Sequence, residues 1–180
     1  MTWSRRSSQN AQTEASRAEF ERAFNQHWEP LCRVLYQLTG DEAEAEDLAL
    51  EALLQLYHHP PADHRNLSGW LYRVATNLGL NALRSRKRRQ RYETEAGDLE
   101  LQTNRPEDPA IRYELWLEHE RVRAALGSIK PRSAQILVLR HSGLTYAEIA
   151  AALGVASSSV GTLLVRAEQE FEQAFKELLA

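Results

Sequence analysis

Residues 145–166, TYAEIAAALGVASSSVGTLLVR, predict two short helices joined by a tight turn. Thr145 and, three residues later, Glu148 form a capping-box pattern that begins the first helix, and the serines at 157–159 offer N-caps for the second helix. Gly154 lies where the turn requires a positive φ angle, which glycine adopts without steric cost. Such a pair of helices is typical of a helix-turn-helix, whose second helix enters the major groove of DNA.

The chain has 180 residues, of which 43% are hydrophobic, and a formal net charge of −3. This length suits one large domain or two small ones with modest cores. The single cysteine excludes an internal disulfide and a cysteine-rich zinc site, which fits the reducing cytoplasm. No apolar run approaches the roughly 20 residues of a membrane-spanning helix, so we expect no membrane insertion.

Apolar residues recur at spacings of three and four along most of the chain, and no alternating strand pattern is present. We therefore predict an all-α fold with two small helical domains joined by a flexible acidic linker. The expected segments are a disordered N-terminal tail at residues 1–16, a helical bundle at 17–92, the linker at 93–112 and the helix-turn-helix domain at 113–180. The tail has paired arginines but no apolar segment behind them, so we do not expect a secretion signal.

Local signals predict where helices of the first domain begin and end. Pro30 should start a new helix or kink an existing one. Gly40 should end that helix, Asp41 should cap the next one, and Ser68 should cap a third. The apolar face that the second helix should bury consists of Ala45, Leu48, Ala49, Ala52, Leu53 and Leu56.

The charges are unevenly distributed along the chain. Six cations lie within eight residues, and the following stretch 93–114 carries seven acids against two arginines. A solvated helix end seldom needs so many cations, so this basic block predicts salt-dependent contact with phosphates. Its members are Arg84, Arg86, Lys87, Arg88, Arg89 and Arg91.

Three stretches in this order resemble the extracytoplasmic-function (ECF) group of the sigma-70 family, the initiation factors of bacterial RNA polymerase. They are LTGDEAEAEDLALEALLQLY at 38–57, LSGWLYRVATNLGLNALRSRKRR at 67–89 and IKPRSAQILVLRHSGLTYAEIAAALGVASSSVGTLL at 129–164. The resemblance implies a first domain that binds the clamp helices of the polymerase's largest subunit and opens the −10 promoter element. It implies a second domain that binds the −35 element and the flap of the second-largest subunit.

The resemblance also implies that an anti-sigma factor binds the protein, and that the chain has no catalytic activity of its own. We expect no cofactor and no metal, although three histidines lie near residues 58–64.

The resemblance implies that the second helix of the first domain contacts polymerase. The family usually has glutamine at position 50 and an aromatic residue at position 53, where this chain has leucines. An outward leucine is easier to explain in an interface than in water, although an acidic solvated face remains the alternative. The candidate polymerase-binding residues are Asp47, Leu50, Glu51, Leu53 and Leu54.

A polar stripe on the third helix is the candidate surface for opening DNA strands. Arginines hold phosphates, asparagines bond base edges and an aromatic ring stacks on an unpaired base. Core packing is an equal alternative for Trp70, and the family usually has aspartate where Asn81 stands. The candidate residues are Asp63, His64, Arg65 and Asn66 in the loop, Trp70, Arg73, Asn77, Asn81 and Arg84 in the stripe, and Arg86, Lys87, Arg88 and Arg89 in the basic block.

The second helix of the helix-turn-helix is unusually acidic. The family commonly has cations at positions 161, 163 and 168, where this chain has Gly161, Leu163 and Glu168. We therefore expect −35 contacts to concentrate at the helix N-terminus, where exposed amides assist phosphate binding. The candidate residues are Ser157, Ser158, Ser159, Thr162 and Arg166, with Lys130, Arg132 and Arg140 flanking them.

Two alternatives remain open on the sequence. The chain could be a helix-turn-helix regulator that binds duplex DNA as a dimer, without polymerase. It could also be a protein-interaction module whose DNA contacts have weakened, as the acidic helix would suggest.

Overall fold

The structure is a computed structural model that describes residues 3–61, 66–96 and 109–179. Over these residues the chain forms seven helices and no strand, which confirms the all-α prediction. The helices are α1 (Trp3–Thr39), α2 (Glu42–His58), α3 (Leu67–Ala96), α4 (Pro109–Ser128), α5 (Pro131–His141), α6 (Tyr146–Leu153) and α7 (Ser157–Glu177).

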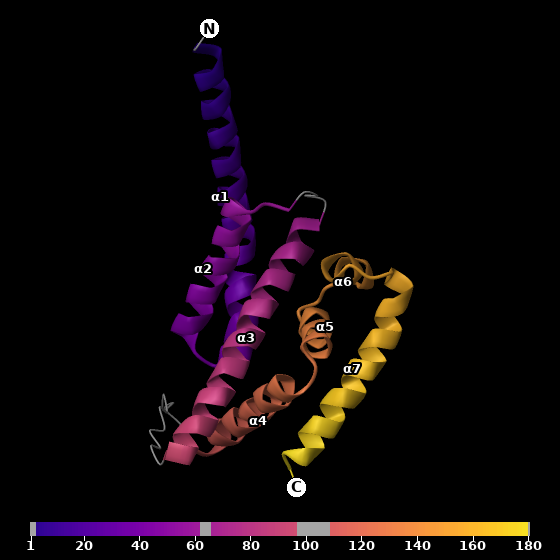
Figure 1. The fold of residues 1–180 in the computed structure, drawn as a ribbon. Coiled ribbons are helices and arrows are strands. Elements are labelled where there is room, and N and C mark those ends of the chain that lie inside the picture. The colour runs from indigo at the N-terminus through magenta and orange to yellow at the C-terminus, as the bar shows by residue number, and fades with distance from the viewer. Residues whose placement is uncertain (1–2, 62–65, 97–108, 180) are drawn as a thin grey trace.

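The helix α3 lies between two groups of helices. Figure 1 shows α1 and α2 on one side of α3. The helices α5, α6 and α7 lie on the other side, and α4 lies near the C-terminal end of α3. One core cluster joins α1, α2 and α3, and a second joins α5, α6 and α7. The predicted linker at 93–112 overlaps the end of α3 and the start of α4, and its residues 97–108 lie outside the described part of the chain.

The helix α1 is longer than the sequence predicted. It begins at Trp3, so it includes most of the segment expected to be a tail at residues 1–16. Residues 4–19 contain no glycine or proline, so nothing in them interrupts a helix. The helix also continues through Pro30 to Thr39, which excludes a new helix at that proline.

The helix ends of the first domain follow local capping. Gly40 has a φ of 73°, and the side chain of Asp41 accepts a 2.8 Å hydrogen bond from the Glu44 amide, as predicted for the start of α2. The prediction for α3 was wrong by two residues. Asn66, and not Ser68, accepts a 3.0 Å bond from the Gly69 amide.

A third core cluster joins the two domains. Leucines 80 and 83 of α3 and two residues of α1 pack in it against α4 and α5. The two domains therefore share buried apolar surface, whereas the sequence predicted only that a flexible linker joins them. The buried members are Val34, Leu38, Leu80, Leu83, Leu126, Ile129, Ala134 and Val138.

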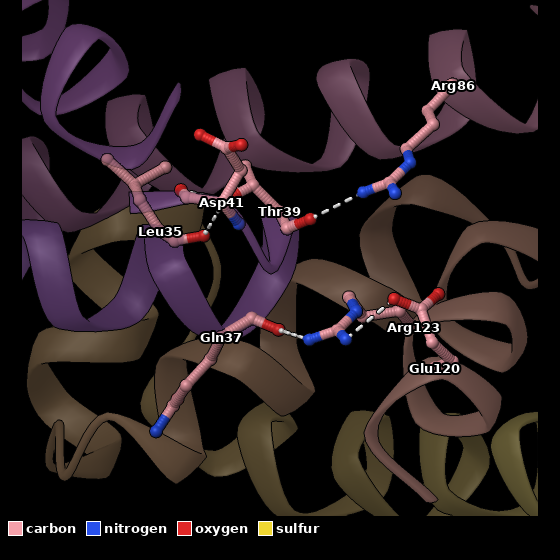
Figure 2. Close-up of polar contacts among 7 residues, drawn as sticks. All are labelled: Leu35, Gln37, Thr39, Asp41, Arg86, Glu120 and Arg123. Carbon is pink, nitrogen blue, oxygen red and sulfur yellow. Dashed lines mark hydrogen bonds and ion pairs between the residues drawn. The ribbon is translucent and has the colours of Figure 1, made fainter. Parts of the chain in front are cut away.

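Two arginines bond the C-terminal end of α1, as Figure 2 shows. Arg86 of α3 donates to the Thr39 carbonyl at 3.0 Å, and Arg123 of α4 donates to the Gln37 carbonyl at 3.4 Å. Both carbonyls belong to the last turn of α1, where cations interact favourably with the helix dipole. The Arg123 side chain is only 7% exposed and also pairs with Glu120 at 2.8 Å.

No single helix among the described residues is long and apolar enough to cross a membrane. The pair α6 and α7 meets the criteria of length and composition only as two helices bent by 89°.

We expect Gly40→Ala to lower the free energy of unfolding by about 2 kcal/mol or more. A Cβ at this position would lie 2.9 Å from Cζ of Arg123, and this clash adds to the cost of a positive φ angle, which is about 1 kcal/mol alone. Urea unfolding monitored by circular dichroism measures the loss.

The matched control is Gly143→Ala. Gly143 has a φ of 86°, and nothing lies within 4 Å of its Cβ position, so only the backbone cost applies. Equal losses of unfolding free energy in the two variants would show that contact with Arg123 does not restrict the residue at position 40.

Candidate nucleic-acid interface

The helix-turn-helix forms as the sequence predicted. Thr145 and Glu148 make a reciprocal capping box at the start of α6, and Gly154 ends that helix with a φ of 65°. The hydrogen bonds from Thr145 hold the pKa of Glu148 below its ordinary value. The helices α6 and α7 are bent by 89° from each other, which leaves the first turn of α7 at the corner.

The serines at the start of α7 do not cap the helix. The N-cap residue is Ala156, and no side chain bonds the free amides there. The three serines lie in the first turn, and like Thr162 and Arg166 they are exposed. The free amides and the hydroxyl groups therefore remain available to a phosphate at this end.

The flanking cations of the second domain are engaged within the protein. Lys130 forms a 2.8 Å ion pair with Glu170 on α7, and this bond lowers the pKa of Glu170. Arg132 donates to the Leu153 carbonyl at 3.3 Å. Arg140 donates to the Leu144 carbonyl and lies 5.6 Å from the ring centre of Tyr146. All three remain exposed, but phosphate contact requires part of these bonds to be given up.

The polar stripe of α3 divides between the core and the surface. Trp70 is half-buried and packs against the first core cluster, whereas Asn77 and Asn81 are exposed. Arg84 is half-buried, and its Nη2 atom is buried without a hydrogen-bond partner among the described residues. Burial lowers the pKa of Arg84.

The basic block also divides into two parts. Arg86 is half-buried and donates a hydrogen bond to the Thr39 carbonyl of α1, so we assign it a structural role. Lys87, Arg88 and Arg89 are exposed, and Arg88 donates to the Ser85 hydroxyl at 3.2 Å. These three cations are the exposed part of the block among the residues whose side chains the structure describes.

The predicted base-reading loop is only partly described. Asp63, His64 and Arg65 lie outside the described residues. Asn66 is described. Its side-chain oxygen accepts a hydrogen bond from the Gly69 amide, and its side-chain Nδ2 donates to the Glu148 carbonyl of α6 at 3.3 Å. The structure therefore gives Asn66 a capping role and a contact between domains.

The candidate polymerase face of α2 is corrected at one position. Asp47, Leu50, Glu51 and Leu54 are exposed, and each of the two leucines is 41% exposed. Leu53 is fully buried in the first core cluster, because it lies on the inward face with Ala45, Ala49, Ala52 and Leu56. It therefore offers no surface to a partner.

Sequence reasoning missed one member of that face. Tyr57 is 45% exposed and lies three residues after Leu54, one helical turn along the same side of α2. Its signal in the sequence is the spacing of three to four residues that links it to the two exposed leucines.

Sequence reasoning also missed Gln135, which joins the two domains. This residue of α5 is only 8% exposed and donates through Nε2 to Oδ1 of Asn77 at 2.8 Å and to the Arg73 carbonyl at 3.2 Å. It also lies 3.4 Å from the Thr76 hydroxyl. Its signal in the sequence is a polar residue flanked by buried Ala134 and Ile136. The second domain thus covers part of the stripe that the sequence assigned to strand opening.

Two family models match the chain in order. The model of sigma-70 region 2 matches residues 23–89, and that of sigma-70 region 4 matches residues 119–171. These ranges contain the α2 face, the α3 stripe and the helix-turn-helix.

Proteins with similar sequences are named ECF RNA polymerase sigma factors. The ECF RNA polymerase sigma factor SigE of Mycolicibacterium smegmatis is 30% identical over 165 residues, which cover 87% of this chain and 62% of SigE. The ECF sigma factor SigG of Mycobacterium tuberculosis is 32% identical, over 83% of this chain and 48% of SigG. The chain therefore matches about half to three-fifths of the length of these relatives.

The fold has a solved counterpart. The sigma factor RpoE of Bartonella quintana, solved with the anti-sigma factor NepR, matches with a TM-score of 0.53 and 20% identity. The match covers 88% of this chain and 97% of RpoE.

We expect Gln135→Glu to separate the second domain from α3 while each domain stays folded. The substitution keeps the volume but places a carboxylate against two oxygen acceptors, at a cost of about 1–3 kcal/mol or more. Small-angle X-ray scattering should show a larger radius of gyration than for the unchanged protein.

The matched control is Gln173→Glu on the exposed face of α7, where the amide bonds Glu177 of the same helix. An unchanged radius of gyration in Gln135→Glu, with the same circular dichroism, would contradict a role for Gln135 in holding the domains together.

Proposed function

Because this chain belongs to the sigma-70 family, we propose that it is an ECF-type sigma factor, which binds core RNA polymerase and directs transcription initiation at a subset of promoters. The observation that carries the proposal is the ordered pair of regions 2 and 4, each of which contains a helix that the sequence proposes for DNA binding. On this proposal the protein works in the cytoplasm and has no catalytic activity of its own, since polymerase performs the chemistry.

The α2 face supports a polymerase contact in the first domain. Leu50, Leu54 and Tyr57 form an exposed apolar stripe, with Asp47 and Glu51 beside it. An apolar centre with a charged rim is the usual anatomy of a protein interface. We assign this face to the clamp helices of the largest subunit, and the second domain to the flap of the second-largest subunit.

The α3 stripe and the basic block support binding and opening of the −10 element. Exposed Asn77 and Asn81 supply groups for unpaired bases, while Lys87, Arg88 and Arg89 supply charge for the backbone. While the two domains are packed together, the side-chain oxygen of Asn77 accepts a hydrogen bond from Gln135. Strand opening on this surface therefore requires the second domain to leave α3, and polymerase binding would supply the energy for that separation.

The first turn of α7 supports a −35 contact of modest strength. The serines and Thr162 present hydroxyl groups beside free amides, but the later turns carry Glu168 and Glu172 toward solvent. Contact by the first turn alone fits a domain that relies on polymerase to hold it on DNA. It does not fit a regulator that must bind duplex DNA unaided.

We also propose a protein inhibitor as a partner. The Bartonella quintana sigma factor of similar fold was solved with its anti-sigma factor. A partner that binds this chain and holds its two domains together would keep the α3 stripe covered.

Run-off transcription with purified core polymerase tests the proposed function. We expect transcripts that start only when this protein is present, and we expect Leu54→Asp to abolish them, because a carboxylate would enter the apolar polymerase contact. Tyr36→Asp, at an apolar side chain of α1 that is 53% exposed and lies outside the surfaces assigned to polymerase, is the matched control. If no transcript on any genomic fragment depends on this protein, the sigma-factor function is refuted. The alternative of a protein-interaction module would then stand.

We expect the triple variant Lys87→Gln, Arg88→Gln and Arg89→Gln to flatten the salt dependence of promoter binding by the polymerase complex. Each lost phosphate contact should reduce the slope of log K against log salt by about 0.9, so the total change is about 2–3. Fluorescence anisotropy across a potassium chloride series measures the slope.

The control for this variant is Arg86→Gln. Arg86 bonds the Thr39 carbonyl, so its loss should lower stability and leave the slope nearly unchanged. A full slope in the triple variant would contradict the assignment of the exposed cations to phosphates.

A further inference from the structure

A basic hollow lies where α3 meets the C-terminal end of α4. Its volume is about 630 Å³, which is within the usual range for small-ligand sites. The α3 wall supplies three cations and two small polar side chains, and the α4 wall supplies a glycine and a serine. The lining residues are Asn81, Arg84, Ser85, Lys87, Arg88, Gly127 and Ser128.

The charge in the hollow is not neutralised within the described part of the chain. None of the lining residues is acidic, and neither Arg84 nor Lys87 takes part in an ion pair there. The Nη2 atom of Arg84 is buried and lacks a hydrogen-bond acceptor among the described residues. A guanidinium without an acceptor is costly to bury, and an anion in the hollow would give the Arg84 side chain a partner of opposite charge.

The hollow exists only while the two domains are packed together. Gly127 lies over Leu83 of α3, and a Cβ at Gly127 would be 3.5 Å from the Leu83 side chain. Leu83 belongs to the third core cluster, which joins the domains. Gly127 and Ser128 of α4 form one side of this space. The proposed strand-opening function uses some of the same cations only after the domains separate.

We infer that this hollow is a binding site for a small polyphosphate, such as pyrophosphate or the phosphate chain of a nucleotide. Two or three linked phosphates match three cations that surround one space, and hydroxyl and amide groups complete the hydrogen bonding. A ligand that binds only the packed form stabilises that form by mass action. The bound polyphosphate therefore holds the second domain over the α3 stripe.

Isothermal titration calorimetry of the full chain with sodium pyrophosphate, at constant ionic strength, tests this site. We expect saturable one-site binding, and a dissociation constant that rises about tenfold in Arg84→Gln and in Lys87→Gln. Lys87 is exposed, so its variant stays folded even if Arg84→Gln does not. The assay contains neither polymerase nor DNA, so its result is independent of the proposed function.

The matched control is Arg89→Gln, which removes the same charge from the same helix outside the hollow. We expect it to change the dissociation constant by less than about twofold. Ser128→Glu tests the α4 wall, because Ser128 is exposed and lines the hollow, so a carboxylate there should abolish binding without removing a cation. Equal effects of Lys87→Gln and Arg89→Gln, unchanged binding in Ser128→Glu, or heats that do not saturate would each overturn the inference.

Discussion

The helix α3 must pack against both domains at once, and the rest of the structure depends on that constraint. On one side Gly79 lies so close to α1 that a Cβ would be 2.8 Å from Leu38. On the other side Leu80 and Leu83 pack against α4 and α5, and Gln135 of α5 bonds oxygen atoms of Arg73 and Asn77 earlier on the same helix. The residues best suited to bind DNA are thus on the same helix that holds the protein together, and their exposure changes with the packing of the second domain.

The contacts between the domains mix apolar burial with polar groups that water can also satisfy. The third core cluster supplies the apolar part, while Asn66, Gln135 and Arg123 supply hydrogen bonds to backbone or amide oxygens. Such bonds contribute little net free energy when water replaces them, but a mismatched partner is costly. This combination favours one defined packing of the domains and still permits their separation when a partner offers competing contacts.

Much of the fold could be predicted from the sequence, because local rules determine it. The capping box at Thr145, the turn at Gly154 and the cap at Asp41 follow from short-range hydrogen bonding. Periodicity also predicted the buried face that includes Leu53, but the family alignment assigned that residue to the surface. The roles of Arg123 and Gln135 could not be predicted, because each depends on an oxygen atom that only the packing of a distant helix brings near.

The short connection between α3 and α4 limits how far the domains can move apart. From Ala96 to Pro109 the chain makes 13 steps, so at full extension it spans at most about 47 Å. On the proposed function, the domains would bind promoter elements about 25 base pairs apart, which are separated by about 85 Å, so the helices themselves would bridge much of the distance. A tether of this length also keeps each domain at a millimolar effective concentration relative to the other. Re-docking is then a local event, and the open form persists only while a partner occupies the surfaces that separation exposes.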